Sequence, residues 1–186
     1  MEEREQEKEK PVWRRYAGLD LGSKQHPSHL AVIEDRNGIY FQVVSKWWDA
    51  PCALIEVVEE TTCLFQKLKV QRLCWDATRG ELQVLKEQGK LPWRWQGVVF
   101  TPESKKKMAG RLAVYLEQRR LKLLPDERQT RSLLQVDALL KAEADENTGH
   151  GDAFWSLALS LEAAHENPSI ANRYLELLNN RVVYFA

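Results

Sequence analysis

The segment from Ala153 to Ala164 is apolar on nearly every side of the helix that it would form. A helix with one polar face can lie at a protein surface, whereas a helix without such a face has to be buried by other elements. Elsewhere the chain offers short runs rich in β-branched and aromatic residues, which are typical of strands. We therefore expect this helix to be buried against a β-sheet.

Three strand-like runs follow one another near the start of the chain, at Arg15–Gly22, Leu30–Asp35 and Ile39–Ser45. Asn37-Gly38 separates the last two, and this dipeptide is a strong signal for a two-residue hairpin turn. The three runs together predict an antiparallel meander.

The rest of the chain alternates between helix and strand patterns. We expect helices at Pro51–Lys69, Glu81–Gln88, Pro102 onward after a Thr101 N-cap, Ala153–Ala164 and Pro168–Asn179, and strands at Arg72–Thr78, Gly97–Phe100 and Leu121–Leu124. The stretch 126–148 has a helical middle and no other clear pattern. This order predicts an α/β fold, a mixed sheet with helices on both faces.

Length and composition favour one domain in a reducing compartment. The chain has 186 residues, which suits one domain, and its 27 basic residues balance its 27 acidic residues. We expect a charged leader at residues 1–12 and a single domain at 13–186. Three cysteines without a CxxC pair indicate free, buried thiols, and neither a secretory signal nor a membrane span is expected.

Three aspartates stand at the ends of apolar segments. Asp20 and Asp76 end two of the expected strands, and Asp152 opens the apolar helix. Carboxylates at the edge of a core need a positive partner to offset their desolvation. A sheet in this order can bring all three together, where they could hold a pair of Mg²⁺ or Mn²⁺ ions about 3.5–4 Å apart for phosphodiester hydrolysis.

The segments around these acids resemble a known family. They are Gly18-Leu19-Asp20-Leu21-Gly22, Cys74-Trp75-Asp76-Ala77-Thr78 and His150-Gly151-Asp152-Ala153-Phe154-Trp155-Ser156-Leu157-Ala158-Leu159. Their order resembles the ribonuclease H-like nuclease fold, and within it the C-terminal nuclease domain of the large terminase subunit of tailed bacteriophages. The His-Gly-Asp before an apolar helix is the most specific of the three.

The resemblance implies a metal-dependent endonuclease that cuts concatemeric double-stranded viral DNA during genome packaging, with little sequence specificity. It implies that Asp20, Asp76 and Asp152 bind two divalent cations, Mg²⁺ or Mn²⁺. The implied partners are DNA, an ATPase motor domain, the small terminase subunit and the portal, in a packaging complex on the procapsid in the host cytoplasm. No GxxxxGK[ST] phosphate loop occurs, so the motor would be absent and the leader would be the remnant of an interdomain linker.

Further residues are candidates for accessory roles. His150 could contact the scissile phosphate or assist product release, and Asp145, Asp137 and Glu34 are candidates for a fourth acid. His26 and His29 form an HxxH pair, but Pro27 between them disfavours a helical pair of metal ligands. Candidate DNA-binding residues are Ser23 and Lys24 after the first strand and Lys105, Lys106, Lys107 and Arg111 on one helix.

Other functions remain open at this point. A branched-DNA resolvase of the same fold would use the same acids, and a non-catalytic domain could bind DNA or dock on a motor. Asp20-Leu21-Gly22-Ser23-Lys24 also fits the first phosphate loop of an actin-like ATPase, although the second glycine-rich loop of that family is missing.

Overall fold

The computed structural model describes residues 13–22, 25–143 and 149–165. These residues form a six-stranded mixed sheet with the order β5-β4-β1-β2-β3-β6. The strands are β1 (Arg14–Asp20), β2 (Ser28–Arg36), β3 (Ile39–Trp48), β4 (Arg72–Asp76), β5 (Trp95–Val98) and β6 (Leu121–Lys122).

The expected antiparallel meander is confirmed. β1 pairs with β2 and β2 with β3, both antiparallel. Asn37 and Gly38 turn the second hairpin with φ angles of 58° and 84°. Both angles are positive, as a type I′ turn requires, and this explains why the Asn-Gly pair marks the turn in the sequence.

The other half of the sheet is parallel. β4 runs parallel to β1, and β5 runs parallel to β4. The carboxyl ends of β1, β4 and β5 therefore lie at the same edge, where β1 meets an antiparallel partner on one side and a parallel partner on the other.

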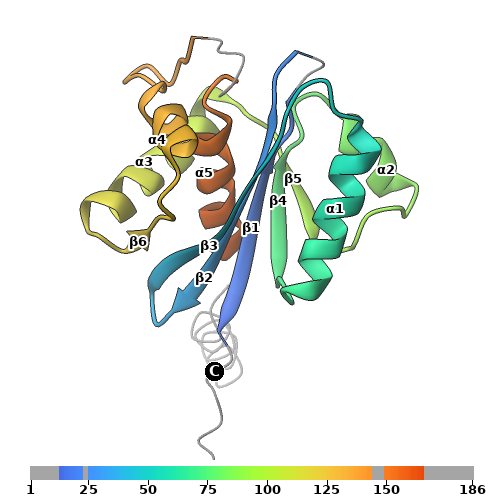
Figure 1. Cartoon of the computed structure of the whole chain (residues 1–186), viewed down its shortest axis with the longest axis horizontal. Helices are drawn as coiled ribbons and strands as arrows, with labels where there is room; N and C mark the ends of the chain where they lie inside the picture. Colours follow the sequence, from blue (N-terminus) through green and yellow to red (C-terminus); the bar gives the residue numbers. More distant parts are fainter. Residues whose placement is uncertain (1–12, 23–24, 144–148, 166–186) are drawn as a thin grey trace, which may run out of the picture.

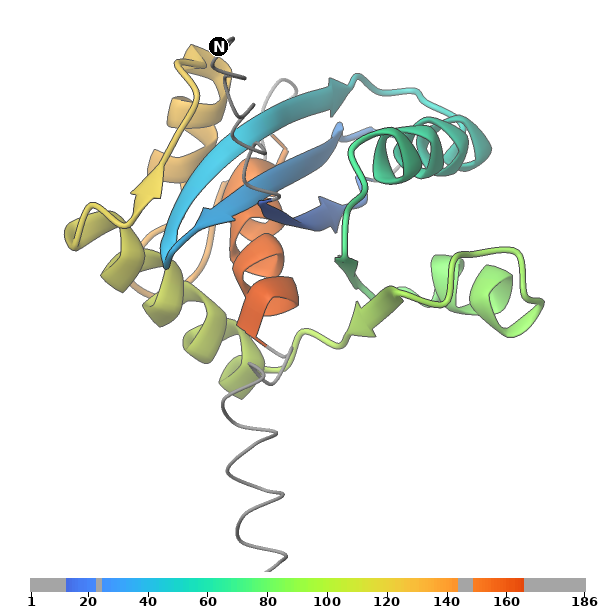
Figure 2. The same ribbon diagram turned by 90° about the horizontal axis from the view of Figure 1, so that it is seen from below.

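Helices cover both faces of the sheet, as the element order predicts (Figure 1). The helices are α1 (Leu54–Lys67), α2 (Glu81–Glu87), α3 (Pro102–Glu117), α4 (Glu127–Leu134) and α5 (Asp152–His165). α1 and α2 lie on one face, and α5 lies on the other with α3 and α4 beside it (Figures 1 and 2). Each face has its own apolar core.

Helix α5 is buried along almost its whole length. Twelve of its fourteen residues are buried, and it packs against β1, β2 and β4 as well as α3. The prediction of a helix buried against a sheet is confirmed. Within the described residues, no helix is long and apolar enough to cross a membrane.

Some sequence-based boundaries were wrong. β5 starts at Trp95 instead of Gly97 because its register follows the parallel pairing with β4, which local sequence does not encode. β6 ends at Lys122, and the helix of the 126–148 stretch, α4, lies at its start (Glu127–Leu134) and not in its middle. The helix expected at Pro168–Asn179 lies outside the described residues. Of the three cysteines only Cys74 is buried, and all three are free thiols.

Candidate active site

Asp20 and Asp76 lie side by side at the carboxyl edge of the parallel strands. Leu19 of β1 is the register partner of Trp75 of β4, so the next residue of each strand is one of the two aspartates. Thr78 fixes the second carboxylate, since its backbone N–H and its hydroxyl both donate to Asp76 Oδ1, at 2.9 and 2.5 Å.

Asp152 reaches the same place from the first residue of α5. The helix can approach β1 closely only because residue 18 is a glycine. A Cβ at Gly18 would lie 1.9 Å from the carbonyl oxygen of Ser156. This close packing of helix on strand brings the start of α5 beside the end of β1.

The loop before α5 fits tightly around the Asp152 carboxylate. The His150 backbone N–H donates to Asp152 Oδ1 at 3.1 Å. Gly149 and Gly151 have φ angles of +62° and +82°, and a Cβ at Gly149 would lie 2.0 Å from Asp152 Oδ2. Only glycine suits such positions, which gives a physical reason for the Gly-His-Gly-Asp sequence.

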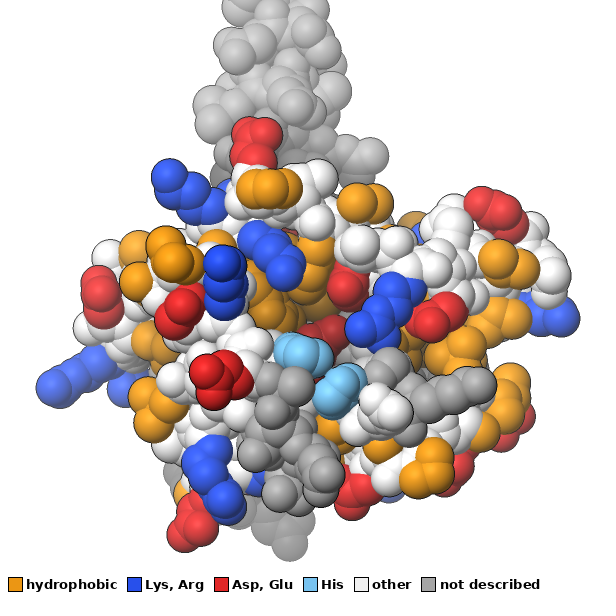
Figure 3. All heavy atoms as spheres, turned by 90° about the horizontal axis from the view of Figure 1, so that it is seen from above, with side chains coloured by type: hydrophobic (Ala, Val, Ile, Leu, Met, Phe, Trp, Pro, Cys, Tyr) orange, Lys and Arg blue, Asp and Glu red, His pale blue; other side chains and the backbone are white. Residues whose placement is uncertain are grey.

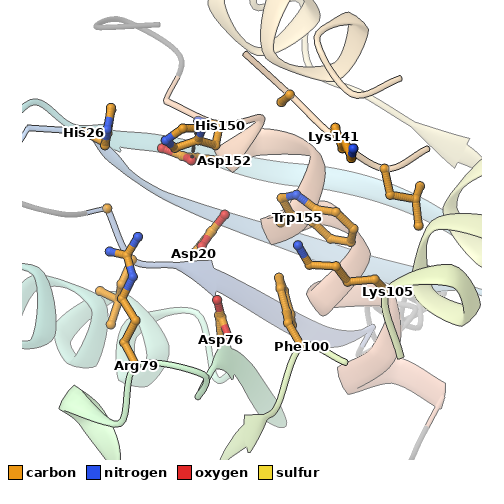
Figure 4. A pocket seen from close by; sticks show the side chains of 14 residues that line it. Asp20, His26, Asp76, Arg79, Phe100, Lys105, Lys141, His150, Asp152 and Trp155 are labelled. Carbon is orange, nitrogen blue, oxygen red and sulfur yellow. Dashed lines mark hydrogen bonds between the residues drawn. The ribbon is translucent and has the colours of Figure 1, made fainter. Parts of the chain in front are cut away.

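The three aspartates line one open pocket of about 450 Å³. Asp20 lies between the other two (Figure 4). The described residues that complete the lining include three basic residues, two aromatic residues and two histidines: Arg79, Lys105, Lys141, Phe100, Trp155, His26 and His150. In the space-filling view, acidic atoms form the floor of this hollow, and basic and histidine side chains surround its mouth (Figure 3).

Lys105 owes its place to a helix cap and two aromatic rings. Thr101 and Ser104 form a reciprocal capping box that starts α3 directly after Phe100. The Lys105 ammonium then lies 5.5 Å from the ring centre of Phe100 and 4.9 Å from that of Trp155. Such cation–π contacts hold the ammonium at the mouth of the pocket.

Burial raises the pKa of two of the carboxyl groups. The pKa of Asp20 is well above its usual value because the group is buried and because Asp152 and Asp76 are close, while Arg79 and Lys105 act in the opposite direction. Burial raises the pKa of Asp152 to about 7, against the His150 backbone hydrogen bond and the positive charge of Arg79. Buried acids that repel each other are typical of sites that bind a cation or a proton.

The residue types at this site fit hard divalent cations, which prefer carboxylate oxygens. Asp152 Oδ2 is buried and has no hydrogen-bond partner among the described residues, so an oxygen ligand is available. Within the described residues, no group of three His, Cys, Asp or Glu side chains is arranged to hold one ion. Asp20 occupies the central position, between Asp76 and Asp152 (Figure 4).

Of the four basic residues expected to bind DNA from one helix, the structure places only Lys105 in the pocket. Lys107 and Arg111 instead form ion pairs with the buried Glu162 of α5. Lys106 lines a separate apolar hollow beside α3. The single basic face expected from the sequence is thus divided, because α5 supplies a buried acid that the local pattern does not reveal.

Two of the candidates for a fourth acid, Glu34 and Asp137, do not line the pocket. Glu34 lies opposite Arg15, toward the other end of β1, and pairs with Arg15 and Arg36 at 2.7 Å each. Asp137 accepts hydrogen bonds from the backbone of Leu139 and Lys141 and so shapes its own loop. Asp145 lies outside the described residues, as do Ser23 and Lys24.

Several residues of the pocket were not predicted from the sequence. Arg79 lies three residues after Asp76 in a turn closed by Gly80, and this spacing was a usable signal. Phe100 and Trp155 were read as parts of a strand and a helix, and no local pattern indicates Lys141. His26 lies at the pocket with its ring 4.6 Å from that of His150, while His29 is fully buried and does not line the pocket.

Comparison with known proteins agrees with this fold. The large terminase nuclease of the thermophilic phage G20c has a TM-score of 0.67 and 18% identity, over 82% of this chain and 83% of that one. The large terminase nuclease domain of Thermus phage P74-26 has a TM-score of 0.63 and 18% identity, over 80% and 78%. The HK97 bacteriophage large terminase has a TM-score of 0.64 and 14% identity. The match covers 82% of this chain but only 40% of that one.

At these identities the likeness shows the fold alone, and it confirms the expected ribonuclease H-like α/β class. No protein-family model matches the chain. No curated protein matches it either.

Proposed function

We propose that this chain is a metal-dependent endonuclease that cuts double-stranded viral DNA during genome packaging. The observation that carries the proposal is the pocket itself, where Asp20, Asp76 and Asp152 meet under a basic rim. An acidic floor attracts divalent cations, and a basic rim attracts a polyanion. The two together fit a phosphodiester substrate.

The proposed cofactors are two divalent cations, Mg²⁺ or Mn²⁺. When bound, such ions supply a hydroxide nucleophile and stabilise the leaving oxygen of the phosphodiester. Asp20 would face both ions, and Asp76 and Asp152 would each face one. The G20c nuclease, which shares this fold, has been solved with bound magnesium, zinc and cobalt.

The basic rim would hold the DNA backbone without reading bases. Arg79 is exposed and makes no hydrogen bond or ion pair with any described residue, so its guanidinium is available to a phosphate. Lys105 is held at the other side of the pocket by two aromatic rings. Contacts to phosphates place a duplex but do not select a sequence, which matches cutting with little sequence specificity.

The chain spans 40% of the length of the HK97 large terminase. An ATPase motor, the small terminase subunit and the portal are therefore proposed as partners of the larger assembly. The site of action would be the packaging complex on the procapsid, in the host cytoplasm.

Cleavage of supercoiled plasmid tests the proposal. The chain should nick and linearise plasmid with Mn²⁺ or Mg²⁺, and EDTA should stop the reaction. Asp20→Asn, Asp76→Asn and Asp152→Asn should each reduce the rate at least about a hundredfold, because each removes charge that holds the ions. Lys106→Ala, outside the pocket, should cut like the parent. Equal cutting by all three aspartate variants and the parent would refute the site.

A further inference from the structure

His29 is a buried ionisable side chain for which the proposed function has no use. It is fully buried, although histidine usually keeps some contact with water. It is also the register partner of Asp20 across the antiparallel β1–β2 pair. Partners in such a pair extend from the same face of the sheet, about 5 Å apart at their Cβ atoms, so His29 points toward α5 as Asp20 does.

His29 is part of a chain of side-chain hydrogen bonds across that face. Its Nδ1 lies 2.5 Å from Ser156 Oγ of α5, and its Nε2 lies 3.0 Å from Ser45 Oγ of β3. Ser45 Oγ in turn donates to Asp126 Oδ2 at 2.8 Å. The Trp47 ring covers the imidazole at 4.3 Å between ring centres.

The direction of this hydrogen-bond chain follows from its acidic end. Although burial acts against it, hydrogen bonds from Gln129, Ser45 and Trp47 lower the pKa of Asp126, which is therefore an ionised acceptor. Ser45 has one proton and donates it to this carboxylate, so it accepts from His29 Nε2–H.

The imidazole itself is neutral. Burial lowers the pKa of His29 to about 3, so the ring carries one proton at neutral pH, and that proton is on Nε2. Its Nδ1 must then accept from the Ser156 hydroxyl. A complete hydrogen-bond chain therefore runs from α5 through β2 and β3 to the residue that caps α4.

Ser156 lies one helical turn after Asp152, and His29 lies directly beside Asp20. The bond between the serine and the histidine therefore joins α5, which carries Asp152, to β2, the strand paired with the β1 of Asp20. It fixes how far the first turn of α5 stands from the β1–β2 pair.

We propose that His29 is a positioning residue that, through Ser156, sets the separation of Asp20 and Asp152 for cation binding. The inference rests on the proposed function, since it assigns a role at the same site. His29 would touch neither the cation nor the DNA.

Helix α5 contains its own matched control. Ser156 and Ser160 are both fully buried, and each hydroxyl lies within hydrogen-bond distance of the carbonyl oxygen three residues earlier. Ser160 donates its proton there at 2.7 Å, whereas the single proton of Ser156 goes to His29 Nδ1 at 2.5 Å. Only Ser156 meets His29. Replacing either serine with alanine removes the same atom from the same helix, so the comparison isolates the bond to the histidine.

The experiment measures Mn²⁺ binding by electron paramagnetic resonance, without DNA and at a temperature where every variant is folded. Ser156→Ala should weaken Mn²⁺ binding about tenfold, the low end of what loss of a direct partner of a metal ligand costs, because Ser156 acts on the aspartates only through the spacing of α5. Ser160→Ala should bind within about twofold of the parent, since its hydroxyl meets only its own helix. Equal binding by the two alanine variants would overturn the inference.

Variants of the histidine give a second test. His29→Asn keeps an acceptor oxygen near the position of Nδ1 and should retain more Mn²⁺ affinity than His29→Leu. Nitrogen-15 chemical shifts of His29 should show a neutral ring with the proton on Nε2. A proton on Nδ1, or an imidazolium at neutral pH, would contradict the direction of the hydrogen-bond chain and the proposed role.

The outcomes separate this inference from the proposed function. If the parent chain binds no Mn²⁺ and does not cut DNA, the proposed function fails and the inference fails with it. If the parent binds Mn²⁺ and cuts, but Ser156→Ala behaves as Ser160→Ala does, only the inference fails.

Discussion

The Asp152 carboxylate is held from one side only. Oδ1 accepts the His150 backbone N–H, whereas Oδ2 is buried with no partner among the described residues. A buried charge in this state is costly unless a cation or a proton compensates it. A carboxylate with one oxygen unpaired among the described residues thus indicates that the pocket binds a positively charged ligand.

This cost predicts how the stability of the metal-free protein depends on pH. The folded-state pKa of Asp152 is about 7 and its unfolded value is near 3.8, so the folded state binds more protons between these values. Stability due to this group is therefore complete below the unfolded pKa and is lost as pH rises through 7. Asp152→Asn should remove that loss. At pH 8 its free energy of unfolding should exceed that of the parent by about 2–4 kcal/mol.

Urea denaturation with EDTA at pH 5 and pH 8 measures this difference. The comparison of parent with variant cancels the contribution of acids away from the pocket, such as Glu34, whose pKa is lowered and whose effect has the opposite sign. Equal pH dependence in the two proteins would show that Asp152 is not strained by its burial.

A second prediction for a single residue concerns substrate binding by Arg79. Arg79→Ala should raise the KM for plasmid about tenfold, because one good phosphate contact contributes about 1–2 kcal/mol. Mn²⁺ binding should not weaken, since the guanidinium repels cations. Arg94→Ala is the matched control, because Arg94 is also exposed but lies just before β5, away from the carboxyl edge. Equal KM values for the two variants would remove Arg79 from the substrate site.

At the scale of elements, the contact between β1 and α5 positions the site. A Cβ at Gly18 would collide with the backbone of α5 at Ser156 and Ser160. The collision involves main-chain atoms, which no rotamer change can relieve. The glycine is therefore a condition for the placement of Asp152 beside Asp20.

Gly18→Ala should destabilise the chain by about 3 kcal/mol or more, as overpacking against backbone does. Gly110→Ala should instead stabilise the chain by about 0.5–1 kcal/mol, because Gly110 is inside α3 and a Cβ there would lie in open space. Chemical denaturation checks both. A neutral Gly18→Ala variant would mean that α5 can move away from β1 without cost.

The sequence predicted well those features that local chemistry determines. Asn37-Gly38 marked the hairpin, Thr101 and Pro102 marked the start of α3, and the apolar segment after Asp152 marked the buried helix. It also predicted that the three aspartates meet, two at the ends of neighbouring strands and the third at the start of a helix packed on the sheet.

Features that depend on contacts between distant segments were not predictable. Glu162 draws Lys107 and Arg111 away from the pocket, and nothing near these basic residues in the sequence reveals that partner. Lys141 lines the pocket from the segment after α4, seven residues beyond the end of that helix. The partners of His29 lie 16 and 127 residues away in the sequence, so only the fold reveals the hydrogen-bond chain.

In the whole molecule, the pocket lies where the strand pairing changes from antiparallel to parallel. β1 has an antiparallel neighbour, β2, and a parallel neighbour, β4. The strand order also reverses at β1, and ligand sites in α/β proteins commonly lie at the carboxyl ends of strands at such a point. The helical layer on one face then contributes two more residues, Asp152 from α5 and Lys105 from α3.

The most direct test of the central claim is a crystal of the chain soaked with Mn²⁺ and measured for anomalous scattering. We expect two peaks about 3.5–4 Å apart, one between Asp20 and Asp76 and the other between Asp20 and Asp152. Anomalous density elsewhere, with none among the three aspartates at Mn²⁺ concentrations that support plasmid cleavage, would contradict it.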